Sequence, residues 1–170
     1  LLYHLAKHSE LMIYCLEPVA EGVASTRRVL DKAQLYGVRV AVHHGSLGEV
    51  AYPDYFADLI ILCDGSAPSE NRPPAEEVYR VLRPCGGIAH FAVDGSAGGA
   101  QAVKRWLLEG KVPDGEIKMA GDAVRIVRGR LPGAGNWTHQ YASAARTGCS
   151  TDQRVRLPLK LLWFGEPGPA

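Results

Sequence analysis

The sequence has no long hydrophobic run, little excess charge of either sign and few cysteines. Its 170 residues include 19 Lys and Arg against 18 Asp and Glu, so the net charge is only +1. A chain without a broad basic surface is poorly suited to hold a phosphate backbone, and we expect no nucleic-acid partner. No apolar segment approaches the roughly 20 residues that span a bilayer, so we expect no membrane partner.

The four cysteines are too far apart to supply the closely spaced ligand pairs of a zinc site. Cys15 and Cys63 lie within apolar runs, where a thiol usually serves as a small core residue. We therefore expect no metal site and four reduced, structural cysteines. The compartment stays open at this point.

Strand-like apolar runs alternate with amphipathic helical segments along most of the chain. The run 57–63 is apolar throughout, which predicts a strand covered on both faces. The segments 117–119 and 124–127, joined at Gly121-Asp122, predict an antiparallel hairpin. This order predicts an α/β fold with a three-layer open sheet, mostly parallel with an antiparallel edge strand. The remaining expected strands are 11–16, 38–43 and 88–93, and the expected helices are 1–10, 21–36, about 73–83 and 98–109.

The composition changes after Arg130. Residues 131–170 are rich in Gly, Pro, Thr and Arg and show no helical period. We expect an α/β domain at 1–130 and a linker followed by a separate segment at 131–170. Because Leu1 stands where a helical pattern is already under way, we also expect the chain to be an excerpt of a longer polypeptide.

Glu17 is the first candidate binding residue, because it closes the apolar run 11–16 and is followed by Pro18. Ligands of open α/β sheets bind beyond the carboxyl ends of the strands, where an acid can accept hydrogen bonds from both ribose hydroxyls. The alternative is an acid that is merely solvated at a strand end. A nicotinamide dinucleotide site places an acid there too, so Glu17 alone does not choose between hydride and methyl transfer.

Four motifs follow one another in the first 130 residues: Glu17, Gly45-Ser46-Leu47, Asp58-Leu59-Ile60-Ile61 and the run 78–87, in which Val-Leu-Arg-Pro precedes Gly-Gly. With these motifs the sequence over roughly residues 1–130 resembles the class I S-adenosylmethionine-dependent methyltransferases. The resemblance implies a Rossmann-like fold and S-adenosylmethionine as cofactor, with Glu17 on the ribose hydroxyls and Gly45-Ser46-Leu47 around the adenine.

The resemblance also places Asp64 at the cofactor and substrate, after the strand 57–63. This sequence departs from the family's pattern in that Ser46 stands where the family usually has an acid. The Gly-rich first strand, which receives the methionine part of the donor, would lie before Leu1. The resemblance implies a small-molecule substrate and, if the methyl donor is used, a cytoplasmic location. No catalytic base is identified, because methyl transfer depends mainly on alignment of donor and acceptor.

His43 and His44 are adjacent residues of an expected strand, so their side chains point to opposite faces and cannot easily bind one ion. We expect structural or solvated roles for both.

The tail contains the motifs 135–141, 146–148 and 161–164, with the aromatic residues Trp137, Tyr141 and Trp163. With these motifs residues 135–165 resemble the entry segment of quinoprotein-like β-propellers of the pyrroloquinoline-quinone type. The resemblance implies a bacterial protein in which the first domain contacts a C-terminal propeller, with pyrroloquinoline quinone as a possible cofactor there. The three aromatic residues are candidates for stacking on a quinone, although such residues more often pack between blades.

Three hypotheses for the function follow. The first is a methyltransferase-like domain of a larger propeller protein. The second is a catalytically degenerate structural or ligand-sensing module, favoured by Ser46 and by the fusion. The third is a nicotinamide-dependent oxidoreductase, so whether the chain is an enzyme remains open.

Overall fold

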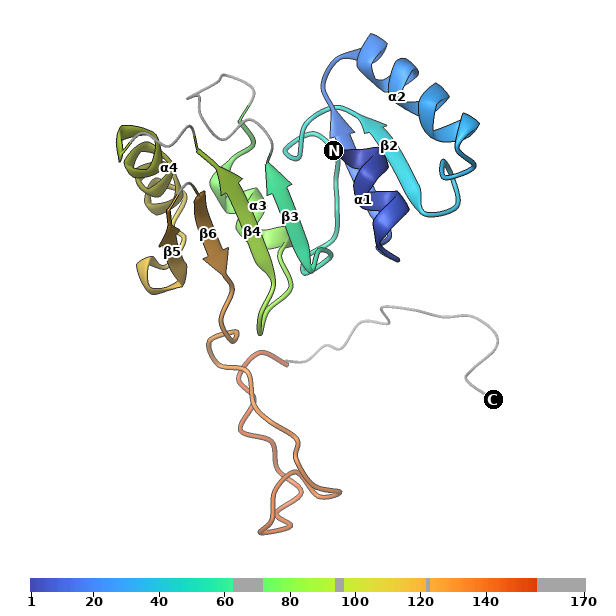
Figure 1. Ribbon diagram of the computed structural model, residues 1–170. Coiled ribbons are helices and arrows are strands. Elements are labelled where there is room, and N and C mark those ends of the chain that lie inside the picture. The colour runs from blue at the N-terminus through green and yellow to red at the C-terminus, as the bar shows by residue number, and fades with distance from the viewer. Residues whose placement is uncertain (63–71, 94–96, 122, 156–170) are drawn as a thin grey trace. The chain divides into compact units, whose positions relative to one another are not determined.

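The computed structural model describes residues 1–62, 72–93, 97–121 and 123–155. The chain divides into two compact units, Leu1–Gly129 and Arg130–Ala170. Every helix and strand of the described residues belongs to the first unit (Figure 1). In chain order they are α1 (Leu2–His8), β1 (Ile13–Glu17), α2 (Ala20–Lys32), β2 (Val40–His44), β3 (Leu59–Leu62), α3 (Ala75–Val81), β4 (Ile88–Ala92), α4 (Ala97–Glu109), a 3-10 turn (Asp114–Glu116), β5 (Ile117–Ala120) and β6 (Ala123–Val127).

The strands of the first unit form two sheets. β1 and β2 pair in parallel, and the second sheet has the order β3-β4-β6-β5. In that second sheet β3 and β4 are parallel, whereas β6 is antiparallel to both of its neighbours. The predicted α/β class, mostly parallel with an antiparallel edge, is therefore confirmed. The structure adds that no strand among the described residues joins β1 to β3.

Each sheet has its own helices and its own core. α1 and α2 pack against β1 and β2, and α3 and α4 pack against the second sheet. Neighbouring residues of β1 point to opposite faces of the sheet. Cys15 packs against the core beneath α1 and α2, whereas Leu16 packs against the core beneath α3 and α4. The two helix pairs therefore lie on opposite sides of β1, as a three-layer fold requires. The buried residues of the smaller core are Ala6, Val23, Leu30, Val40 and Val42, and those of the larger core include Val78, Leu82, Phe91, Val103, Leu107, Val124 and Ile126.

One face of the second sheet is exposed. Leu59, Ile88 and Val127 lie in one row across β3, β4 and β6, and they are 46%, 37% and 39% exposed. Ile61 in the next row is 39% exposed. The expectation that the strand 57–63 is covered on both faces is thus wrong for the described residues, which cover only the face of Ile60 and Leu62.

The Arg-Pro-Cys-Gly-Gly segment between α3 and β4 forms a tight turn. Cys85 and Gly86 have positive φ angles of 62° and 117°. A side chain on Gly87 would overlap the Arg83 carbonyl oxygen, to which the Gly87 N–H donates at 3.0 Å. The motif therefore needs glycine for two reasons, one conformational at position 86 and one steric at position 87.

Two helices end without the glycine that sequence patterns favour. α2 ends at Lys32, four residues before the expected end, because Gln34 adopts φ 57° and the Leu35 N–H donates to the Leu30 carbonyl at 2.9 Å. After α4 the left-handed residue is Lys111, with φ 60°, and not Gly110. Gly110 is needed instead because a side chain there would overlap Ala75 at the start of α3.

The described part of the second unit, 130–155, contains neither helix nor strand. Its turns are joined by Asp152, which accepts hydrogen bonds from the backbone N–H groups of Gly135, Arg154 and Val155 at 2.7–2.8 Å. These bonds lower the pKa of Asp152. Trp137 and Tyr141 are 60% and 51% exposed, and Trp163 lies outside the described residues.

Within the described ranges, the longest helices have 13 residues, and none is long and apolar enough to cross a membrane.

Candidate functional site

Glu17 ends β1 and lies against the first turn of α2. Its Oε1 accepts a hydrogen bond from the Val19 N–H at 3.0 Å, and the residue is half-buried. Gly22 makes room for this arrangement, since a Cβ atom there would come within 2.7 Å of the Glu17 carboxyl carbon. The missing side chain at position 22 thus provides a cradle for the carboxylate between strand and helix.

Gly45 follows β2 and connects the two strand ends, because its N–H donates to the Glu17 carbonyl at 3.0 Å. Its φ of 122° lies in a region that residues with a side chain rarely adopt. The sequence-predicted residues Glu17, Gly45 and Ser46 therefore lie together at the carboxyl ends of β1 and β2. Leu47 is 9% exposed and packs into the larger core, so it anchors this loop.

Glu49 is a residue that our sequence interpretation missed. Its Oε2 accepts a hydrogen bond from the Ser46 N–H at 2.7 Å, while the Glu49 N–H donates to the Ser46 carbonyl at 3.0 Å. The first of these bonds is the main reason that the pKa of Glu49 is lowered. The signal was present in the sequence, because Ser46 and Glu49 have the Ser-x-x-Glu spacing of a capping box.

The two adjacent histidines make separate contacts, as their alternation along β2 predicted. His44 Nε2 lies 3.1 Å from the Pro18 carbonyl oxygen at the exposed strand end. His43 Nδ1 lies 2.7 Å from the Tyr52 hydroxyl, within an aromatic group that includes Tyr14 and Phe56. Burial raises the pKa of Tyr52, so its hydroxyl stays protonated at neutral pH. Both histidines therefore have contacts that account for them without a metal ion.

Asp64, the remaining predicted site residue, lies outside the described residues. Among the described ranges, no group of three or more His, Cys, Asp and Glu residues is arranged to hold a metal ion.

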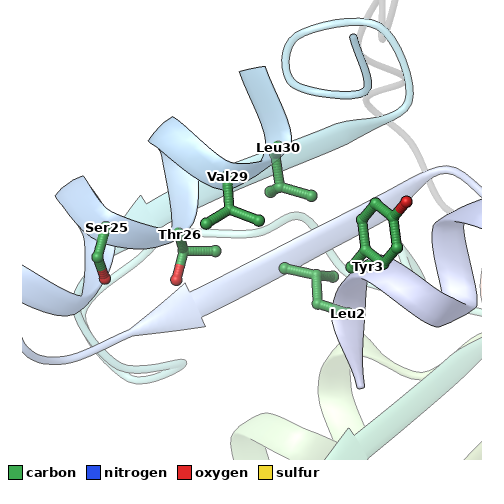
Figure 2. A pocket seen from close by; sticks show the side chains of 6 residues that line it. All are labelled: Leu2, Tyr3, Ser25, Thr26, Val29 and Leu30. Carbon is green, nitrogen blue, oxygen red and sulfur yellow. The ribbon is translucent and has the colours of Figure 1, made fainter. Parts of the chain in front are cut away.

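A shallow hollow between α1 and α2 does not include the candidate site. Its lining consists of apolar and hydroxyl side chains and carries no charge (Figure 2). Glu17, Gly45 and Ser46 are absent from that lining, which is Leu2, Tyr3, Ser25, Thr26, Val29 and Leu30.

The chemistry that the strand ends offer is hydrogen-bond acceptance. Glu17 and Glu49 are carboxylates that accept and do not donate when ionised. β1 and β2 are neighbours, with Glu17 opposite His44, so both acids lie at the carboxyl end of the two-stranded sheet. This end of the sheet suits a ligand that presents hydroxyl or amino donors.

Solved structures with a similar fold include two proteins that carry methyltransferase names. A protein from Methanococcus maripaludis, named as a candidate S-adenosyl-L-methionine-dependent methyltransferase, aligns with a TM-score of 0.61 and 18% identity over 76% of this chain and 72% of its own. An S-adenosylmethionine-dependent methyltransferase from Aquifex aeolicus aligns with a TM-score of 0.50 and 19% identity over 74% and 73%. No family model matches the sequence, and no curated protein does. The chain thus has the Rossmann-like α/β fold found in S-adenosylmethionine-dependent methyltransferases.

Proposed function

We propose that residues 1–129 form the ribose- and adenine-binding half of an S-adenosylmethionine site in a methyltransferase-like domain. The observation that carries the proposal is the position of Glu17, held in the Gly22 cradle beside the Gly45-Ser46 loop in a methyltransferase-like fold. Glu17 accepts hydrogen bonds from the two ribose hydroxyls, and residues 45–47 enclose the adenine. The donor, when bound, supplies an electrophilic methyl group, while this half of the site binds and orients its nucleoside.

The two open strand edges support a further part of the proposal. Among the described residues, β1 pairs only with β2 and β3 only with β4, which leaves two parallel strands with unpaired edges. Exposed edges and a row of exposed apolar residues are costly in a soluble domain. We propose that one more parallel strand, with the Gly-rich turn for the methionine part of the donor, pairs with both edges, and that polypeptide preceding Leu1 supplies it.

Two other functions are compatible with parts of the site. An acid at a strand end also suits a nicotinamide dinucleotide, and Gly-x-Gly-x-x-Gly in the additional strand would favour an oxidoreductase. A degenerate ligand-sensing module is favoured by Ser46, which replaces the acid usual in methyltransferases. The methyl-transfer proposal is preferred because both fold neighbours named above are assigned to that chemistry.

The remaining parts of the proposal concern partners and the second unit. A small molecule is proposed as methyl acceptor, in a cytoplasmic setting, because the net charge of +1 does not favour nucleic acid. The second unit is proposed as the entry to a quinoprotein-like propeller, with pyrroloquinoline quinone as a cofactor of that missing part. Its support is the motif around Trp137 and the exposure of Trp137 and Tyr141, which later blades would cover.

Calorimetry with S-adenosylhomocysteine tests the assignment of Glu17 in the protein as its gene encodes it. Two charge-assisted hydrogen bonds contribute about 1.5–3 kcal/mol each, so Glu17→Ala should weaken binding at least about tenfold. Glu21→Ala is the matched control, because Glu21 is an exposed acid in the first turn of α2, the turn against which Glu17 lies. Equal affinities for the wild type and Glu17→Ala would contradict the assignment.

A further inference from the structure

The four-stranded sheet has one face that no described helix covers, and we propose that this open face binds an amphipathic helix with an acidic flank. The helix is supplied by the polypeptide that precedes Leu1, and only this source rests on the additional strand proposed above. Two neighbouring rows of side chains define the open face. The first row is Leu59, Ile88 and Val127, and the second is Ile61, His90, Arg125 and Lys118.

Alternation along the strands places both rows on the same face of the sheet. In β4, Ala89 and Phe91 are buried in the larger core, so Ile88 and His90 point away from α3 and α4. Residues that lie directly opposite each other in neighbouring strands share a face. The registers of β3, β6 and β5 therefore extend the open face across the whole sheet.

The first row and Ile61 give the open face an apolar strip. These four side chains are 37–46% exposed although they are neighbours on one surface. Contiguous exposed apolar residues mark an interaction site, whereas single ones are common on any surface. A helix is the element that covers the face of parallel strands such as β3 and β4 in α/β proteins.

The second row gives the same face a positive side. Arg125 and Lys118 are opposite each other in β6 and β5, both are exposed, and neither forms an ion pair within the described ranges. Arg125 Nε donates to His90 Nδ1 at 3.2 Å, and Lys118 Nζ donates to the Gly115 carbonyl at 2.8 Å. Two like charges directly opposite each other destabilise a sheet, so carboxylates from a covering segment would stabilise this one.

The arrangement of the two kinds of side chain determines which partner fits. Leu59, Ile61 and Ile88 lie on β3 and β4, whereas Arg125 and Lys118 lie on β6 and β5. A helix along β3 and β4 therefore meets apolar side chains beneath it and two positive charges along one flank. A second copy fits poorly, because a twofold axis brings the cations of one copy onto the cations or the apolar strip of the other.

The position of the apolar strip supports the source of the helix. Leu59 and Ile88 are the first residues of their strands. The proposed additional strand is parallel to β3, so it begins at the same end of the sheet. The polypeptide that leads into it then emerges beside Leu59, and a helix there needs only a short connection to lie on the open face.

Thiol labelling of Ile88→Cys tests the cover in the protein as its gene encodes it, with the chain 1–170 as reference. Reaction with a maleimide is followed by mass spectrometry of the peptide that contains position 88, so other cysteines do not interfere. The rate should be at least about tenfold lower in the longer protein. Gln101→Cys, at an exposed position of α4, should react equally in both. Equal rates at position 88 would overturn the proposal.

Arg125→Glu distinguishes an acidic cover from a neutral one. In the longer protein it should raise the labelling rate of Ile88→Cys at least about threefold, because attraction becomes repulsion. In the chain 1–170 it should not raise the rate, since a nearby carboxylate disfavours the reactive thiolate. Continued protection of the Phe91 amide shows that the sheet stays folded. Arg105→Glu, an exposed change on α4, is the control, and a rate equal to this control for Arg125→Glu would overturn the acidic cover.

Cross-linking from Ile88→benzoylphenylalanine in the longer protein identifies the occupant. The linked peptide should precede Leu1 and carry Asp or Glu beside its apolar positions. A peptide from a second copy, or slow labelling that requires anionic lipid vesicles, would overturn the proposal in favour of a dimer or a membrane surface. Fast labelling at position 88 with protected Leu59 and Ile61 amides overturns this inference alone. Slow labelling with rapid exchange of those edge amides overturns the additional strand instead.

Discussion

The two sheets of the first unit differ in how they are held together and in what they carry. The four-stranded sheet has an extensive core with α3 and α4, whereas the two-stranded sheet depends on the small core around Leu30 and Val42. The smaller half nevertheless carries Glu17 and the Gly45-Ser46 loop. Leu16 and Leu47, which pack into the larger core, connect the two halves. The proposed binding residues therefore lie on the half with the smaller core, and their loop is anchored by the other half.

Truncation of one fully buried leucine in each core should give the largest difference in stability between the two halves. Leu30 and Leu107 are 1% and 0% exposed, and each change to Ala should cost about 2–5 kcal/mol. Leu30→Ala should increase amide exchange in β1 and β2 far more than in β4 and β6, because only the small core loses packing. Leu107→Ala should lower the stability of the larger half. Equal increases throughout both sheets after Leu30→Ala would show that the unit unfolds as one.

Each half also has an arginine that binds carbonyl groups at the end of a helix. Arg128 is 6% exposed and donates to the carbonyls of Tyr79 and Arg80 in the last turn of α3 and of Leu82 directly after it. Its guanidinium lies 4.3 Å from the Tyr79 ring centroid. Arg39 is partly exposed and donates to the carbonyls of Ala6 and Ser9 at the end of α1.

Arg128→Ala should reduce the free energy of unfolding by about 3 kcal/mol, because the buried Leu82 carbonyl and the partly buried Tyr79 carbonyl lose this donor. Arg39→Ala should cost about 1 kcal/mol or less, since water can reach the carbonyls that it leaves. Urea unfolding followed by the fluorescence of Trp106, in chains with Trp137 and Trp163 replaced by Phe, measures the effect of Arg128→Ala, because Trp106 packs against the larger core. Amide exchange in β1 and β2 measures the effect of Arg39→Ala. A smaller effect for Arg128 than for Arg39 would contradict the assignment of the larger core.

Gly98 lies within α4 and Gly110 directly follows it, and together they provide a finer test of the packing in the larger half. Gly110→Ala should destabilise the protein by about 1–3 kcal/mol, because the new methyl group overlaps Ala75. Gly98→Ala is the control, since nothing lies within 4 Å of a Cβ atom at that position and alanine favours a helix. Thermal unfolding should therefore shift downward for the first variant and stay equal or rise for the second.

The second unit should respond to acid through Asp152. Because the pKa of this carboxyl is lowered in the folded state, its contribution is present above the ordinary Asp pKa and is lost as the pH falls through the lowered value. Asp152→Asn should remove this dependence. Amide resonances of Gly135, Arg154 and Val155, followed by NMR from pH 6 downward, report the change; identical titrations of both proteins would rule out Asp152 as its source.

The order and type of the elements were predictable from the sequence because apolar periodicity and the Arg-Pro-Cys-Gly-Gly turn are local signals. The ends of the helices were less predictable, because Gln34 and Lys111 adopt the left-handed conformation that glycine usually adopts at a helix end. Of the site, the position of Glu17 followed from its place at a strand end. Gly22 was not identified, because its role depends on a contact with Glu17 that appears only after folding. Glu49 was not identified although its spacing from Ser46 is that of a capping box.

The exposed face of the second sheet shows a further limit. The run 57–63 is apolar on both faces, and this pattern indicates what a strand needs for burial but not which segment provides it. In the described residues Leu59 and Ile61 remain exposed. That mismatch indicates that this face needs a covering segment that the described residues do not supply.

Hydrogen exchange at the two open edges tests this account most directly. Ile13 donates to Arg39 and Ile88 to Asp58, so strand alternation turns the Tyr14, Leu16, Leu59 and Ile61 amides toward the unpaired edges. In the chain 1–170 these amides should exchange rapidly, while those of Cys15 and Ile60 in the same strands are protected. In the protein as its gene encodes it, all six should be protected, because one parallel strand pairs with both edges. Rapid exchange of the four edge amides in that protein too would contradict the completed sheet and the methyl-donor site built on it.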